Sequence, residues 1–201
     1  MMRLTALVAC FVALLGFAGA AAQGALIQYH ANMDGPSESP TNNSPGVGTT
    51  SVDYDDVAHT LHVHVVFSGL QGNTTASHIH APTAVALAGT AGVATTTPTF
   101  AGFPLGVTSG TYDNTLDLTQ SSSYNPSYVT ANGGTPTSAE AALTSAIAAG
   151  KSYLNVHSSV YGGGEIRGFL VPGAIPEPGT GLLVAAFAGA MGLRRRRVAP
   201  V

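Results

Sequence analysis

Residues 60–68 have the most regular pattern in the chain, because apolar and polar side chains alternate along them. Such alternation indicates a strand with one buried face. Similar short segments recur between turns rich in Gly, Pro and Asn, and one helix is expected at residues 137–149, capped by Thr137 and Glu140. The sequence therefore predicts a mainly β fold, a Greek-key antiparallel β-sandwich or barrel with one short helix. The expected strands are residues 25–33, 47–54, 60–68, 75–80, 89–97, 109–119, 152–157 and 165–171.

The N-terminal residues 1–22 are predicted to be a secretory signal peptide. Arg3 gives a positive start, an apolar stretch follows at residues 4–18, and Ala20 to Ala22 offer a small-residue cleavage site. Signal peptidase cleavage after Ala22 would release a β domain of residues 23–172. The one cysteine, Cys10, lies inside the signal, so the exported domain can form no disulfide. An alternative, lipid attachment at Cys10, fits less well because the apolar run continues beyond it.

The C-terminal residues contain three parts in a fixed order. A linker at residues 173–178 carries Pro-Glu-Pro, an apolar stretch occupies residues 179–193, and an arginine-rich tail covers residues 194–201. The arginines favour a cytoplasmic tail, and a helix of fifteen residues is short for a permanent anchor, about 22 Å against a core of about 30 Å. The motif residues are Pro176, Glu177, Pro178, Arg194, Arg195, Arg196 and Arg197.

This order resembles the PEP-CTERM sorting signal of Gram-negative bacteria. The resemblance implies that a transmembrane sorting helix holds the protein transiently in the inner membrane. It also implies cleavage near Pro-Glu-Pro by an exosortase, and delivery to the cell surface or extracellular matrix, often in bacteria that produce exopolysaccharide.

The domain between the two signals is acidic. Residues 23–178 contain all ten acidic side chains but only two basic ones, Lys151 and Arg167, for a formal net charge of −8. Binding to nucleic acid or to anionic lipid needs a basic surface. The charge therefore argues against both kinds of partner.

Five short motifs follow one another across the domain: residues 34–40, 69–70, 77–80, 153–157 and 164–168. They read Asp-Gly-Pro-Ser-Glu-Ser-Pro, Gly-Leu, Ser-His-Ile-His, Tyr-Leu-Asn-Val-His and Gly-Glu-Ile-Arg-Gly. This ordered set resembles the CHRD domain, found in chordin and in many bacterial secreted proteins. It spans roughly residues 25–171 and implies a secreted β domain whose function is not settled.

The motif Ser-His-Ile-His is also similar to the copper-site hairpin of copper/zinc superoxide dismutase. In that resemblance His157 corresponds to a later copper ligand and Arg167 to the arginine that guides the anion. The metal-bridging histidine is missing, because no histidine lies between His80 and His157. The zinc-site histidines and the disulfide cysteines are missing as well. The resemblance therefore implies a related fold rather than the activity.

The histidine pattern predicts a metal site on its own terms. His78 and His80 are two apart in an expected strand, so they point to the same face and can serve as a ligand pair for Zn or Cu. His157 joins them if its strand is adjacent. Pairing of residues 60–68 with residues 75–80 would add His62 and His64 opposite the pair. The alternative is that these histidines face solvent and bind nothing.

Two functions remain open. The first is an exported, non-catalytic surface or matrix module that binds protein, glycan or metal, with extracellular polysaccharide or surface proteins as partners. The alternative is a small metal-dependent redox enzyme related to copper/zinc superoxide dismutase, with Cu or Zn as cofactor. Arg167 is expected either beside the metal or, with Glu165, in a structural hydrogen-bonded hub.

Overall fold

A computed structural model describes residues 26–173 of the chain. The predicted signal peptide at residues 1–22, the Pro-Glu-Pro motif, the apolar stretch at residues 179–193 and the arginine tail lie outside the described residues. Among residues 26–173, no helix is both long and apolar enough to cross a membrane.

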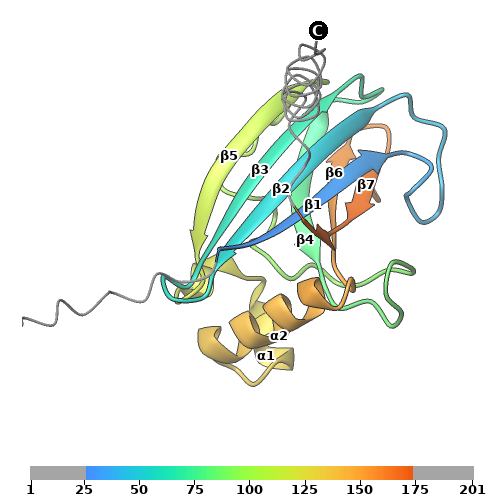
Figure 1. Cartoon of the computed structure of the whole chain (residues 1–201). Coiled ribbons are helices and arrows are strands. Elements are labelled where there is room, and N and C mark those ends of the chain that lie inside the picture. Colours follow the sequence, from blue (N-terminus) through green and yellow to red (C-terminus); the bar gives the residue numbers. More distant parts are fainter. Residues whose placement is uncertain (1–25, 174–201) are drawn as a thin grey trace, which may run out of the picture.

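The described chain forms one antiparallel sheet that curls into a half-barrel (Figure 1). The strands follow the order β4-β6-β7-β1-β2-β3-β5, and β8 pairs with β1 beside β7. The mainly β, antiparallel prediction is confirmed, and of the two architectures left open the sheet takes the barrel-like one. The strand bounds are β1 Leu26–Asp34, β2 Val47–Asp55, β3 Thr60–Ser68, β4 Thr74–His80, β5 Gly110–Asp117, β6 Tyr153–Ser158, β7 Ile166–Phe169 and β8 Val171–Pro172.

The inner face of the sheet is apolar, as the alternation along β3 predicts. Each odd-numbered residue of β3 from Leu61 to Phe67 is buried, while the residues between them are half-buried or exposed. The same core receives Ile79 from β4 and Val156 from β6. Strands from both ends of the sheet therefore pack into one apolar core. This packing fixes which faces of β4 and β6 point inward.

The predicted pairing of β3 with β4 is wrong. β3 lies between β2 and β5, and β4 pairs with β6 at the other end of the strand order. The turn between β3 and β4 does not close a hairpin, because the amides of Leu70 and Thr74 donate instead to carbonyls of Thr108 and Val107. The strand expected at residues 89–97 does not form. That segment makes only isolated β-bridges, one of them at Val93.

Two α-helices and a short 3₁₀ helix lie at one end of the strands (Figure 1). The expected helix is α2, Pro136–Ala148, but its cap is Thr135 rather than Thr137, because Pro136 suits the first helical position and Ser138 returns the capping hydrogen bond. The 3₁₀ helix η1, Ser121–Ser123, and α1, Pro126–Ala131, were not expected.

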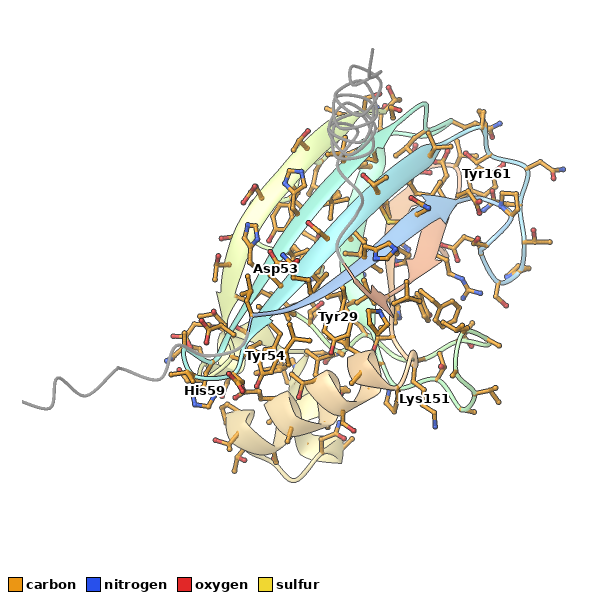
Figure 2. The ribbon with its side chains drawn as sticks, in the orientation of Figure 1. Tyr29, Asp53, Tyr54, His59, Lys151 and Tyr161 are labelled. Carbon is orange, nitrogen blue, oxygen red and sulfur yellow. The ribbon has the colours of Figure 1, made fainter. Side chains whose placement is uncertain are left out.

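The predicted capping residue of α2 has another role. Glu140 is buried and accepts hydrogen bonds from the Tyr54 hydroxyl at 2.8 Å and from His59 Nδ1 at 2.9 Å. Figure 2 labels Tyr54 and His59 where the strands meet the helices. Glu140 therefore joins α2 to the sheet instead of capping its own helix.

Candidate metal centre

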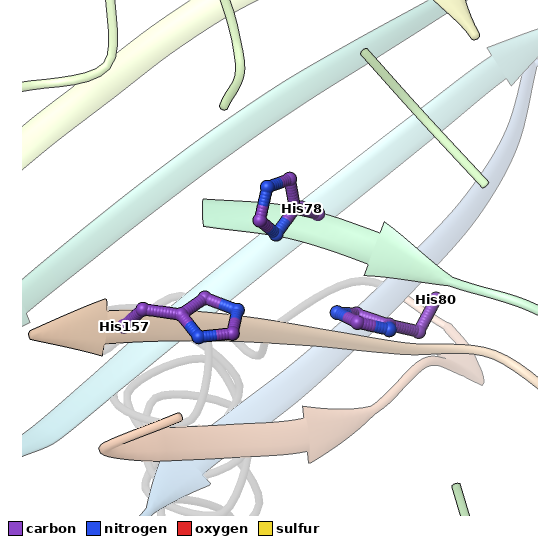
Figure 3. Close-up of side chains that lie close together, drawn as sticks. All are labelled: His78, His80 and His157. Atoms are coloured by element: carbon purple, nitrogen blue, oxygen red, sulfur yellow. The ribbon is translucent and has the colours of Figure 1, made fainter. Parts of the chain in front are cut away.

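Three histidines from two neighbouring strands converge on one point. His78 and His80 project from β4, and His157 projects from β6 beside them (Figure 3). The ring centroids of His78 and His157 are 5.1 Å apart, and those of His80 and His157 are 6.2 Å apart. One ligand nitrogen from each ring lies within 4.8 Å of the other two. In the pairing of β4 with β6, Ala76 lies opposite His157 and His80 lies opposite Tyr153. The three histidines therefore project from the same face of the sheet.

Each ring is oriented by a backbone carbonyl. His78 Nε2 lies 2.6 Å from the Pro98 carbonyl oxygen, and His80 Nδ1 lies 2.9 Å from that of Ala91. His157 Nδ1 lies 2.9 Å from the carbonyl oxygen of Gly162. A carbonyl only accepts, so each of these nitrogens carries the proton. This is the outer-shell arrangement that orients histidines at metal sites.

The second nitrogen of each ring is therefore a lone-pair donor. These atoms, His78 Nδ1, His80 Nε2 and His157 Nε2, are buried and have no hydrogen-bond partner. A buried polar atom without a partner costs free energy, typically about 1–3 kcal/mol. Three such atoms close to one another could hold a single metal ion.

Burial also keeps the three rings uncharged. It lowers the pKa of His78 to about 4, although the hydrogen bond to Pro98 opposes the shift. Burial likewise lowers the pKa of His80 and of His157. Metal ligation requires neutral imidazole, so the site is prepared for a cation at neutral pH.

The ligand atoms suit Zn or Cu. Imidazole nitrogens bind both ions, and Zn–N bonds measure about 2.0–2.1 Å. A structural or trapped ion fits better than an open catalytic one, because the ligand nitrogens have almost no contact with solvent.

The sequence model of the CHRD domain matches residues 29–170, which is most of the chain. The protein belongs to the CHRD family. No curated protein and no solved structure matches the chain. The likeness to copper/zinc superoxide dismutase and the PEP-CTERM assignment therefore stay sequence-based predictions.

In this CHRD domain, His62 and His64 do not join the three-histidine cluster, contrary to the prediction. Both lie on β3, and Asp113 of β5 holds them through contacts of 2.8 Å to His62 Nε2 and 2.9 Å to His64 Nδ1. The reason is the sheet order, which puts β2 and β5 rather than β4 beside β3.

Arg167 is a buried hub. Its Nε donates to the Ser37 carbonyl, and its Nη1 lies 3.1 Å from the Gly89 carbonyl oxygen. The distance from Nε to Glu38 Oε2 is 3.9 Å. The guanidinium also lies 4.8 Å from the centre of the Tyr153 ring. These contacts hold the Arg167 side chain within the domain, as a structural role requires.

Glu165 holds the turn that leads into β4. Its carboxylate accepts from Ser44 Oγ at 2.6 Å and from the amides of Gln71 and Gly72. Burial raises the pKa of Glu165, but hydrogen bonds to Ser158, Ser44 and the two amides outweigh it and lower the pKa overall. Glu165 and Arg167 thus have separate sets of partners rather than pairing with each other.

Sequence reasoning missed the groups that orient the rings. The Pro98 and Ala91 carbonyls belong to the long segment between β4 and β5, and the Gly162 carbonyl belongs to the turn after β6. Every residue carries a carbonyl, so no residue type could mark these three. Tyr153, which stacks on the His80 ring at 4.7 Å, could be anticipated from its alternation with His157 along one strand.

Proposed function

We propose that this protein is an exported, non-catalytic CHRD module of the cell surface or extracellular matrix, and that it binds one Cu or Zn ion through His78, His80 and His157. The observation that carries the proposal is the convergence of three buried lone-pair nitrogens, each on a ring oriented by a carbonyl. An uncompensated cluster of this kind costs stability, and a bound cation would remove that cost.

The non-catalytic part of the proposal is supported by the surroundings of the site. The ligand nitrogens are shielded from solvent, and Arg167 is already engaged by two carbonyls and an aromatic ring. Two N–H groups of Arg167 already donate to carbonyls and the residue is 6% exposed, which does not suit an arginine that guides anions from solvent. The redox-enzyme alternative is tested by assaying copper-loaded protein for superoxide dismutation, and turnover that is lost in His80→Ala would favour it.

The export route rests on the two terminal signals. Signal peptidase would cleave after Ala22, and an exosortase-type enzyme would cleave near Pro176 to Pro178, so the inner membrane would hold the protein only transiently. Extracellular polysaccharide or surface proteins are then its neighbours. The intact mass of protein recovered from the cell envelope or medium tests this route. Arg194 to Arg197 still present in the exported pool would contradict tail removal.

The metal site is tested by titration calorimetry with Zn²⁺ and with Cu²⁺ on tag-free exported protein. Wild type is expected to bind one ion, and His80→Ala and His157→Ala are expected to weaken binding by more than the roughly 10–100-fold that loss of an outer-shell group costs. His62→Ala is the matched control and should bind as wild type does. Equal affinity in wild type, His80→Ala and His157→Ala would refute the site.

A further inference from the structure

Asn155 lies beside the three histidines but makes no hydrogen bond through its side-chain oxygen. It is directly opposite His78 in the pairing of β4 with β6, and it precedes His157 by two residues on the same strand face. Residues directly opposite in an antiparallel pair have Cβ atoms about 5 Å apart. The Asn155 side chain is 1% exposed, and its Oδ1 is buried without a partner.

The nitrogen of the Asn155 amide lies on the side of an acidic residue, Glu38. A Cβ placed on Gly164 would lie 2.3 Å from Glu38 Oε1 and 2.9 Å from Asn155 Nδ2, so these two atoms crowd the same point. A carboxylate accepts hydrogen bonds and an amide NH₂ donates them, so the nitrogen of Asn155 belongs on the Glu38 side. The oxygen is then directed away from Glu38, on the strand face that Asn155 shares with His157 and with the opposing His78.

We propose that Asn155 Oδ1 is the fourth ligand of the three-histidine site, so that the domain provides a His₃Asn cage for a divalent cation. This inference rests on the proposed metal-binding function and adds the specificity of the site. Four ligands of nitrogen and oxygen type match the tetrahedral preference of Zn²⁺ in closed protein sites. An oxygen ligand does little for a soft ion such as Cu⁺.

The decisive comparison is between a divalent and a monovalent ion in the same variant. Asn155→Leu removes the oxygen and keeps similar bulk, so Zn²⁺ affinity should fall about ten-fold or more while Cu⁺ affinity, measured under reducing conditions, stays unchanged. Asn114→Leu on β5 is the matched control, because it alters an asparagine on a strand away from β4 and β6. It should bind both ions as wild type does.

A second variant covers the case in which Asn155→Leu does not fold. Asn155→Asp keeps an oxygen at the position, so it should retain Zn²⁺ binding and shift the visible absorption spectrum of the Co²⁺-loaded exported protein. An unchanged Co²⁺ spectrum in Asn155→Asp would overturn the ligand role, as would equal loss of Zn²⁺ and Cu⁺ affinity in folded Asn155→Leu. Absence of histidine-dependent binding in wild type would instead overturn the metal site itself.

Discussion

The chain contains the pattern His-x-His twice, and the two copies have opposite surroundings. His62 and His64 on β3 share the Asp113 carboxylate on an exposed sheet face, whereas His78 and His80 on β4 are buried and hydrogen-bond to backbone carbonyls. A carboxylate stabilises the imidazolium form, while burial with a neutral carbonyl stabilises the imidazole form. The spacing alone therefore does not distinguish a pair held by a carboxylate from a pair whose free nitrogens could hold a metal ion.

The difference is visible in the direction of the pKa shifts. The hydrogen bond to Asp113 raises the pKa of His62, while burial lowers the pKa of His78 to about 4. The second nitrogens of the β4 pair are buried without partners close to His157, whereas both rings of the β3 pair turn a nitrogen to the single Asp113 carboxylate. What the histidines contact thus decides their chemistry.

The largest expected effect is the acid sensitivity of the metal-free protein. The pKa of His78 is about 4 when folded and about 6.5 when unfolded, so below pH 6.5 the unfolded chain binds a proton that the folded chain does not. The free energy of unfolding therefore has its full value above pH 6.5. It falls by on the order of 3 kcal/mol as the pH is lowered toward 4. Urea unfolding of wild type and His78→Gln at pH 7 and pH 4.5 measures this decline. An equal pH dependence in both proteins would show that His78 is not the source.

Metal binding should stabilise the protein through the β4 pair and His157, and not through the β3 pair. At a free Zn²⁺ concentration one hundred times Kd, a site present only in the folded state contributes about 2.7 kcal/mol. Thermal unfolding with and without Zn²⁺ should show this gain in wild type and in His64→Ala, and not in His157→Ala. A comparable gain in His157→Ala would remove the contrast between the two pairs.

The smallest expected effect is at the exposed pair. The raised pKa of His62 means that its contact with Asp113 stabilises the fold fully below the unfolded pKa, and that this contribution is lost as the pH rises through the folded pKa. Asp113→Asn should return the pKa of His62 toward its ordinary value, because the hydrogen bond to Asp113 is the main cause of the shift. NMR titration of the histidine ring protons measures it, with His78 as the internal control. An unmoved His62 pKa would contradict the assigned partner.

The sequence predicted best what depends on neighbours along the chain. The alternation in β3 identified its buried face, and the spacing of His78 and His80 placed them on one side of a strand. Strand pairing was harder, because a short turn suggested a hairpin between β3 and β4. In the structure Glu165, distant in the sequence, accepts hydrogen bonds from the amides of Gln71 and Gly72 within that turn. The residues of the turn alone do not predict such a distant partner.

The three histidines of the candidate site could be predicted from the sequence, but the groups that orient their rings could not. His157 depended on the unproven adjacency of two strands, which the pairing of β4 with β6 now provides. The Ala91 and Pro98 carbonyls, which set the ring orientations, come from the connection between β4 and β5 that the sequence suggested was partly strand. The cap of α2 shows the same limit, since Thr135 and Thr137 are equally suitable residue types and only the backbone selects one.

The pairing of β4 with β6 has a consequence for a domain that contains no cysteine. An ion held between His78 and His157 would tie together two points separated by a loop of about 80 residues, the topological role that a disulfide serves in many exported proteins. Unlike a disulfide, this tie needs no oxidant to form and no reductant to open. A chelator or sufficient acid would release it, and added metal would restore it.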